Sequence, residues 1–400
     1  MTDFDATRAL FHLPDGLAYL DGNSLGPLPK AVPARLAEMV EADWKDRLIG
    51  GWTAGWGGAG WMSAPGAVGD RIGALIGAPE GSVTTGDTLS VKVYQALAAA
   101  LDMRPDRRMI LSDSGNFPSD LYMAQGLARS LGRGHELRVV APDEVAGAIT
   151  DEVAVLMLTE VDYRTGRLHD MPALTALAHE AGALAIWDLA HTAGAIPIDV
   201  TGSGADFAVG CSYKYLNGGP GAPAFIHVAP RHAETAQPAL QGWLGHAAPF
   251  DFDPDYRPGP GIERMRVGTP PMLQLAALDA ALDAFDMTSM AAIRERQIAL
   301  SERFVAAVEG ATDLVLASPR DPARRGSQVS FRHADGYAVM QNLIAEGVIG
   351  DFRAPDILRF GIAPLYNGED DVDRAADVLA SILRSGSWDD PRYRARKTVT

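Results

Sequence analysis

The chain has 400 residues, of which 47% are hydrophobic, and this is enough to bury the cores of two or three domains. Acidic residues outnumber basic ones by 51 to 35, so the formal net charge of −16 repels nucleic-acid phosphates and anionic membrane surfaces. A small-molecule substrate is therefore favoured, with no nucleic acid and no membrane as partner.

The start of the chain, MTDFDATRALFHLPDG, lacks the basic region of a secretory signal, and no apolar run approaches the ~20 residues that cross a membrane. Cys211 is the only cysteine, so no intrachain disulfide can form, which is typical of a reducing compartment. We expect a cytoplasmic protein.

Between about residues 82 and 228, short apolar or β-branched runs alternate with longer helical patterns. The predicted strands are Ser82–Gly86, Met109–Asp113, Glu136–Ala141, Val153–Thr159, Ala183–Asp188, Asp206–Cys211 and Pro223–Val228, and helices are predicted over Thr88–Met103, Pro118–Leu131 and Pro172–Ala181. This α/β alternation predicts a mostly parallel sheet with helices on both faces, and a ligand site at the carboxyl edge of the sheet.

The pattern changes after the Pro/Gly/Asp-rich stretch PFDFDPDYRPGPG (249–261). Two long helices are predicted over about 271–286 and 288–309, followed by strands Asp313–Leu316, Gln328–Arg332 and Leu358–Ile362 and helices near 336–346 and 369–384. We expect a large domain over 56–285 and a small α+β domain over 286–400, with residues 1–55 packing against the small domain.

Two residues at predicted strand ends indicate pyridoxal 5′-phosphate (PLP) chemistry. Lys214 lies in the glycine-rich loop of GCSYKYLNGGPGAP (210–223), and Asp188 ends the strand in WDLAH (187–191). A lysine amine forms the imine with the PLP aldehyde, and a carboxylate keeps the pyridine nitrogen protonated. Alone, the lysine would be interpreted as a solvated charge and the aspartate as a helix N-cap; together and in this order they favour PLP.

Weaker signals concern the cofactor phosphate and ring. TTGDTLSVK (84–92) is a strand-to-helix junction whose first turn, with Leu89 and Ser90, offers backbone amides to a phosphate, although helix capping alone would explain Ser90. NFPSD (116–120) starts another helix, and Phe117 there can stack on a pyridine face or belong to the core.

The chain resembles the kynureninase family along nearly its full length. The resemblance is carried by YLDGNSLGPLPK (19–30), NFPSD, TGRLHDMPAL, WDLAHTAGAIP, CSYKYLNGGPGAPAF, GWLGH (242–246), RVGTPP (266–271) and APLYN (363–367). Related PLP families share the strand-end aspartate and lysine but not CSYKYLNGGPG or GNSLG. The resemblance implies the type I PLP fold and a homodimer with active sites shared between subunits.

The resemblance also assigns roles to individual residues. Lys214 matches the Schiff-base lysine and Asp188 the partner of the pyridine nitrogen, and Tyr213 is the candidate for proton transfer. The implied cofactor contacts are Leu89, Ser90, Phe117, Asp120, Thr159, His191 and Tyr213, with Trp243 and Thr269 reaching the phosphate side from the neighbouring subunit. Arg359 matches the arginine that grips the substrate α-carboxylate, though a structural ion pair is the ordinary interpretation of an isolated arginine. Ser24 in GNSLG is a further substrate contact, and no metal is expected.

Three positions depart from the animal members of the family, which carry histidine, serine and asparagine where this chain has Trp52, Gly268 and Thr269. We expect these residues to line the aryl end of the substrate pocket and to favour L-kynurenine over its 3-hydroxy form, as in the bacterial type. The repeated glycines and tryptophans leave Trp56 as an alternative to Trp52. Lys92 stands where many relatives have asparagine, and the sequence gives no account of it.

The reaction that the resemblance implies is a hydrolysis at a carbon–carbon bond of a ketonic substrate. L-Kynurenine, or 3-hydroxykynurenine, would lose its Cβ–Cγ bond to give anthranilate, or 3-hydroxyanthranilate, and L-alanine, in tryptophan degradation or NAD biosynthesis through the kynurenine pathway. A cysteine desulfurase or selenocysteine lyase is the nearest alternative, but it needs a cysteine on a mobile loop, and Cys211 lies three residues before Lys214. A catalytically idle relative should have lost the lysine or the aspartate, and both are present.

Overall fold

The computed structural model describes residues 2–396, and its largest element is a seven-stranded sheet with the strand order β2-β8-β7-β6-β5-β3-β4. The strands are β2 (Val83–Thr85), β3 (Met109–Asp113), β4 (Glu136–Val140), β5 (Val153–Thr159), β6 (Leu184–Asp188), β7 (Phe207–Gly210) and β8 (Phe225–Val228). From β7 to β4 all neighbours are parallel, whereas β8 is antiparallel to both β7 and β2. The predicted mostly parallel sheet is confirmed, and each predicted strand ends within two residues of the observed one.

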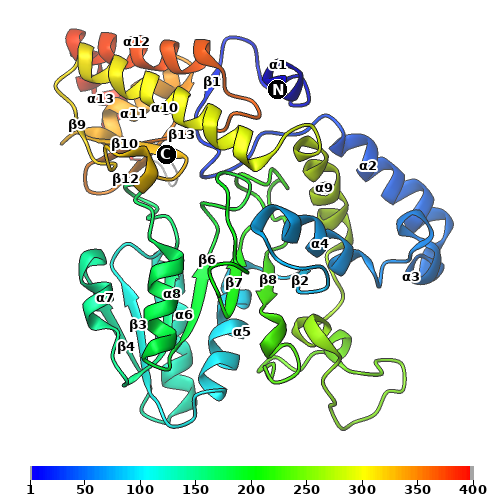
Figure 1. Cartoon of the computed structure of the whole chain (residues 1–400). Helices are drawn as coiled ribbons and strands as arrows, with labels where there is room; N and C mark the ends of the chain where they lie inside the picture. The colour runs from blue at the N-terminus through cyan, green and yellow to red at the C-terminus, as the bar shows by residue number, and fades with distance from the viewer. Residues whose placement is uncertain (1, 397–400) are drawn as a thin grey trace.

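Helices cover both faces of this sheet, because successive strand residues turn their apolar side chains to opposite sides (Figure 1). One face packs against α5 (Leu89–Asp102) and α6 (Pro118–Leu131), and the other against α4 (Ala64–Ile76), α7 (Val145–Ala148), α8 (Met171–Glu180) and α9 (Met272–Leu282). Val155 and Leu156, adjacent on β5, accordingly belong to different cores.

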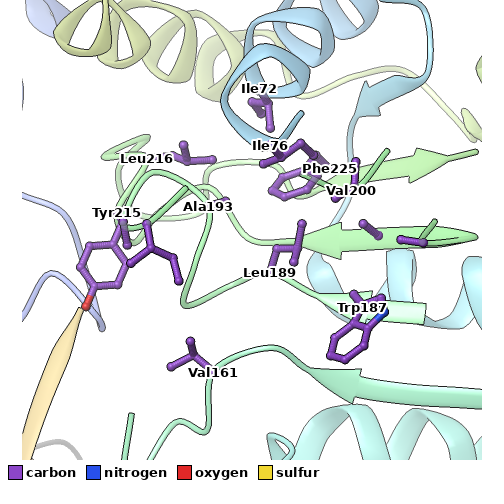
Figure 2. Close-up of a cluster of buried hydrophobic side chains, with 14 of the residues drawn as sticks. Ile72, Ile76, Val161, Trp187, Leu189, Ala193, Val200, Tyr215, Leu216 and Phe225 are labelled. Carbon is purple, nitrogen blue, oxygen red and sulfur yellow. The ribbon is translucent and has the colours of Figure 1, made fainter. Parts of the chain in front are cut away.

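The core on the α4 side also anchors the loop that carries Lys214. Figure 2 shows Ile72 and Ile76 of α4 near Phe225, with Leu216 and Tyr215 farther along the same cluster. Leu216 and Tyr215 follow Lys214 directly and are almost fully buried. Their burial fixes the backbone on the C-terminal side of the lysine.

A second, antiparallel sheet lies beside the first, with the strand order β12-β13-β10-β9. Its strands are β9 (Val315–Leu316), β10 (Gln328–Arg332), β12 (Asp351–Arg353) and β13 (Ile357–Gly361), and its helices are α10 (Met290–Ala311), α11 (Gly336–Ala345), α12 (Glu369–Ser385) and the short α13 (Pro391–Arg394). Side chains of this sheet and of α10, α11 and α12 form a separate hydrophobic core.

The N-terminal segment contacts both parts of the molecule. After α1 (Phe4–Arg8), strand β1 (Ala18–Tyr19) pairs in parallel with β11 (Val348–Ile349) next to the small sheet. Helix α2 (Val32–Glu38) instead packs on α9, and a π-helical stretch and α3 (Gly51–Ala54) continue from it. The domain boundaries near residues 55 and 285 stay a proposal. None of the helices described here is both long and apolar enough to span a membrane.

Candidate active site

Lys214 lies just beyond the carboxyl end of β7, and its amine is held among polar and aromatic side chains. Its Nζ is 2.9 Å from His191 Nε2. The same Nζ lies 5.8 Å from the ring centre of Phe117 and 5.9 Å from that of Tyr213. Burial, and then the lysine charge, lower the pKa of His191 well below its ordinary value, so the imidazole is neutral beside the amine.

The lysine loop is held from the N-terminal side by the GNSLG motif. Gly26 N–H donates to Tyr213 O at 2.8 Å. A Cβ at Gly26 would stand 2.5 Å from Lys214 O and 2.4 Å from Asn217 Oδ1, so only glycine permits this approach. Asn217 itself has a left-handed backbone with φ 58°, which turns the chain away after the lysine.

Two carboxyl groups lie next to Lys214, one on each of two neighbouring elements. Asp188 ends β6 and accepts the Ala190 N–H at Oδ1, 2.8 Å away, and Asp120 is in the first turn of α6. Burial, and then the charge of Asp188, raise the pKa of Asp120 well above its ordinary value. Burial also raises the pKa of Asp188, but Lys214 and the Ala190 N–H oppose that rise. Asp188 is therefore the member of the pair that ionises first.

Thr159 ends β5 directly opposite Asp188 in the parallel pairing. Its hydroxyl is buried and donates to Val161 O at 3.3 Å and to Asp188 O at 3.5 Å. Phe117, the residue before α6, is 40% exposed and meets the ring of Tyr163 edge-on at 5.1 Å between centres. One face of Phe117 is thus free to receive a flat ligand.

Helix α5 begins with backbone amides that no side chain caps. The N-cap residue Thr88 makes no side-chain hydrogen bond to the helix, and Leu89 and Ser90 in the first turn are only half-buried. Free first-turn amides are the usual receptor for a phosphate. Lys92, which the sequence left unexplained, is buried and donates to Asp87 Oδ2 at 3.3 Å and to Gln95 Oε1 at 3.0 Å, so it braces the turn before the helix.

Arg359 on β13 faces this group from the second sheet. Its guanidinium donates to both oxygens of Asp351, to Tyr163 O and, at 3.3 Å, to Ser24 Oγ. Because Tyr163 also contacts Phe117, and Phe117 lies by the lysine amine, the residues form a continuous path from Lys214 to Arg359. The structure therefore shows Arg359 in an ion pair with Asp351, as the ordinary interpretation of an isolated arginine has it.

Trp52, Trp243, Gly268 and Thr269 form a different group. Trp52 lies 6.5 Å from Trp243 and 5.9 Å from Trp61 between ring centres, and Gly268 and Thr269 are exposed. No contact among the described residues joins them to Lys214. Trp56, the alternative to Trp52, is stacked under Arg35 at 4.8 Å, away from Trp243.

Three residues of the site were missed in the sequence. Glu160 follows Thr159 and is almost fully buried, with Oε2 lacking a hydrogen-bond partner among the described residues. Asp351 and Arg353 lie on β12, a strand of three residues that was not predicted. The available signal was the alternation of charged and apolar residues in Asp351, Phe352 and Arg353, which has the period of a strand.

The polar atoms that the chain leaves unpaired fit a polar aromatic cofactor. His191 Nδ1 and Asp120 Oδ2 are buried without a partner in the described chain, and both residues are neighbours of Lys214. A pyridine ring between Asp188, Phe117 and Lys214, with its phosphate at α5, would meet a carboxylate, an aromatic face, an amine and free amides. The donor set therefore suits PLP.

Comparison with known proteins agrees with this geometry. The chain is similar to the apo structure of a cysteine desulfurase from Thermococcus onnurineus NA1, with a TM-score of 0.77 and 18% identity over 95% of this chain and 98% of that one. It is also similar to a C-DES mutant with glycine covalently linked to its PLP cofactor, with a TM-score of 0.81 and 16% identity over 95% and 99% of the two chains. The chain therefore has the type I fold of PLP-dependent enzymes.

Closer relatives narrow the class to one family. The family model described as the kynureninase C-terminal domain matches residues 293–379. A kynureninase from Burkholderia pseudomallei is 48% identical over 401 residues, covering 98% of this chain and 95% of the relative. One from Deinococcus radiodurans is 51% identical over 380 residues, covering 94% and 92%. The chain belongs to the kynureninase family.

Proposed function

We propose that this protein catalyses the kynureninase reaction, the hydrolysis of the Cβ–Cγ bond of L-kynurenine to anthranilate and L-alanine, with 3-hydroxykynurenine as a second substrate. The observation that carries the proposal is the path of contacts from Lys214 through Phe117 and Tyr163 to Arg359. It links the amine of Lys214 to the guanidinium of Arg359 through two aromatic residues, which supports the proposal that both groups bind one amino acid. The identity to kynureninases over nearly the whole chain supports the same reaction.

Bound PLP supplies an electron-accepting ring for charge that develops on the substrate carbons. Lys214 would hold its aldehyde and, once displaced by the substrate amine, take the α-proton at Nζ. The Asp188 carboxylate keeps a pyridine nitrogen protonated, which the neutral Asp120 beside it cannot do. The first-turn amides of Leu89 and Ser90 receive the phosphate.

Tyr213 is the proposed proton donor near the substrate γ-ketone. Burial raises the pKa of its phenol above the ordinary value, so the O–H stays protonated at neutral pH and can be donated. Its position next to Lys214 places the phenol and the amine on the same loop. Arg359 and Ser24 bind the α-carboxylate, so the bond to be broken is held in a fixed orientation.

We further propose that the enzyme works as a homodimer whose subunits complete each other's sites. Trp44, Leu48 and Ile49 expose large apolar surfaces, and they line a cavity of about 560 Å³ together with Thr269. Apolar patches of this kind are typical of protein interfaces. An interface here would explain why Trp243 and Thr269 lie away from Lys214 in their own chain. The cytoplasmic location expected from the sequence stays a prediction.

Cysteine desulfurase activity is disfavoured by the environment of the only cysteine. Cys211 is 3% exposed, and burial raises the pKa of its thiol. A buried, protonated thiol does not attack a substrate sulfur. The similarity to cysteine desulfurases, at 18–20% identity, is a similarity of fold.

The test is to add L-kynurenine to PLP-loaded protein and to follow anthranilate fluorescence and L-alanine formation together. We expect both products in equal amounts, and borohydride reduction should fix the cofactor on Lys214. A protein that binds PLP on Lys214 but forms no anthranilate would contradict the reaction. Reduction at another lysine would contradict the site.

A further inference from the structure

Asp351 is the nearest charged neighbour of Arg359, and the sheet itself brings the two together. They are directly paired across the antiparallel strands β12 and β13, so their side chains leave the same face. Arg353, two residues along β12, shares that face, and its Nη2 is 2.8 Å from Asp351 Oδ2. Asp351 and Arg359 are each about 1% exposed. One buried carboxylate thus pairs with two guanidinium groups.

The guanidinium of Arg359 has two edges that can bind a carboxylate. The side-on edge presents Nε and Nη2, and the end-on edge presents Nη1 and Nη2. Nε and Nη2 both donate to Asp351, which takes the whole side-on edge in the bidentate manner. Nη1 donates to Tyr163 O, and Nη2 also reaches Ser24 Oγ at the long distance of 3.3 Å. Four of the five N–H groups therefore have acceptors in the described part of the chain, and the end-on edge keeps one free N–H and one weakly bonded N–H.

Ser24 links the two edges. Its hydroxyl donates to Asp351 Oδ2 at 2.6 Å while it accepts from Arg359 Nη2. A carboxylate arriving at the end-on edge would replace the weak Ser24 contact without disturbing the Asp351 pair. The side-on edge is fixed to the sheet, and the end-on edge is available to a ligand.

The charges of the cluster point to an anionic ligand. Arg353, Arg359 and Asp351 together carry one excess positive charge. Asp21, which bridges to β13 at Gly361, is the remaining carboxyl group of the cluster. Burial, and then Asp351, raise the pKa of Asp21 above its ordinary value, which favours its neutral form. Arg359 is almost fully buried, whereas the Arg353 side chain is 33% exposed, so part of this excess charge is costly to bury and one monoanion would balance it.

We propose that Asp351 is the positioning residue for the substrate α-carboxylate: it holds the side-on edge of Arg359 against the small sheet and so presents the end-on edge, with Ser24, to that carboxylate. This inference rests on the proposed function, because it takes the substrate to be an α-amino acid. Arg353 also pairs with Asp351, so the single negative charge of that carboxylate does not fully neutralise the positive charge of Arg359.

The test compares PLP-loaded wild type with Asp351→Asn, which keeps the shape but removes the charge. L-Alanine, which carries the α-carboxylate but no aryl group, is titrated by the absorbance change of the bound cofactor, and KM and kcat are measured with L-kynurenine. Glu302→Gln is the matched control, since Glu302 is the partner of Arg325, an arginine as buried as Arg359 but paired elsewhere. Asp351→Asn is also made in an Arg359→Lys background.

We expect Asp351→Asn to raise the alanine Kd and the kynurenine KM by about tenfold or more, with kcat at saturation changed by less than about threefold. Glu302→Gln should leave both constants at wild-type values, whatever it does to Tm. In the Arg359→Lys background, Asp351→Asn should add less than about twofold, because the two residues act through one contact. The proposal would be overturned if Asp351→Asn had the wild-type alanine Kd. It would also be overturned if Asp351→Asn raised the alanine Kd by the same factor in the Arg359→Lys background as in wild type.

Two further outcomes are separated by design. If Asp351→Asn does not fold, Asp351→Glu keeps the charge but moves the carboxylate by one methylene group, and an unchanged alanine Kd in that variant refutes the positioning role. If wild type makes no anthranilate, the proposed function fails, while the alanine titration still decides whether Asp351 acts through Arg359.

Discussion

At the scale of single residues, Asp188, Asp120 and Glu160 are three of the buried carboxyl groups of the site, and their ionisation differs because their neighbours differ. Asp188 has a cationic amine and a backbone N–H close by, Asp120 has another carboxyl group, and Glu160 has mainly the hydroxyl of Thr192. Desolvation disfavours the charged form of all three, and only Asp188 has strong compensation. This asymmetry makes Asp188 suitable to hold a protonated nitrogen.

Asp188→Asn should keep the fold and much of the PLP binding but lose most of the activity, because an amide cannot hold the pyridine nitrogen protonated. We expect kcat to fall by about a hundredfold or more, measured as anthranilate release. Asp113→Asn is the control, since Asp113 also ends a strand and is buried but pairs with His169 at 2.7 Å. Near-wild-type turnover in Asp188→Asn would contradict the role of the carboxylate.

Glu160→Gln should change how stability depends on pH. Burial raises the pKa of Glu160 to about 8, above the value of about 4.3 expected for the unfolded chain. The folded state then binds more protons between these values, so stability is full below about pH 4.3 and is lost as the pH rises towards 8. The variant cannot ionise there, so its Tm relative to wild type should increase from pH 5 to pH 8.

The control for this series is Glu180→Gln at an exposed helix position, which should follow the wild-type Tm at every pH. A difference between Glu160→Gln and wild type that stays constant across the range would show that Glu160 does not titrate in it.

At the scale of elements, sequence patterns predicted the strands of the large sheet closely, because buried parallel strands are continuous apolar runs between turn residues. Helix α4 was not predicted, since its glycines disguise the helical pattern. Gly69 in that helix lies so close to β2 that a Cβ would stand 2.2 Å from Val83 O. The glycine that weakens the helix pattern is what lets the helix pack.

The site was predictable to the extent that it consists of strand ends. Lys214 and Asp188 could be paired from the sequence because neighbouring parallel strands end at one edge. The contact of Asp351 with Arg359 depends on the register between β12 and β13. The hydrophobic pattern of two such short strands does not determine that register. The proposed role of Trp52, Gly268 and Thr269 was recognised only through family resemblance, because no pattern of strand ends joins these residues to Lys214.

Trp52 in α3 and Gly268 in the loop before α9 provide a test of substrate choice. Exchanging Trp52, Gly268 and Thr269 for histidine, serine and asparagine adds polar partners for a 3-hydroxyl, whose unpaired burial should cost about ten- to a hundredfold in kcat/KM. Wild type should prefer L-kynurenine, and the triple variant should narrow or reverse that ratio. A Cβ at Gly268 meets nothing within 4 Å, so the serine fits without strain.

Trp56→His is the control for register, because Trp56 is the tryptophan that packs under Arg35. If the ratio of kcat/KM for the two substrates is equal in wild type and the triple variant, these positions do not select the substrate. If Trp56→His alone changes that ratio, Trp56 is the residue that contacts the aryl group.

At the scale of the whole molecule, the separation of Trp243 from Lys214 makes subunit sharing testable. Lys214→Ala and Trp243→Ala dimers should each be nearly inactive, but exchange of subunits in an equal mixture should restore about a quarter of wild-type activity. Half of the dimers are then mixed, and each mixed dimer has one intact site. Light scattering should report a dimer throughout.

The matched control mixes Lys214→Ala with Asp188→Asn, two residues of the same site in one chain. That mixture should form no intact site, because each mixed dimer carries one of the two defects in each of its sites. Asp188→Asn mixed with Trp243→Ala should instead place both defects in one site, leave the other site intact and recover activity as the first mixture does. An absence of recovery in the Lys214 and Trp243 mixture would mean that each site is built within one chain.

The segment from Leu20 to Gly26 connects the small sheet, which carries Arg359, to the loop that carries Lys214. Leu20 is hydrogen-bonded to Ile349 and Gly361 beside Arg359, and Gly26 is bonded to Tyr213 beside Lys214. So few residues reach only about 3.3–3.6 Å each when extended. The segment is therefore a short tether, and the small sheet cannot slide freely away from the lysine while its end bonds persist. The tether therefore sets an upper limit on how far the Arg359 guanidinium can move from the Lys214 amine.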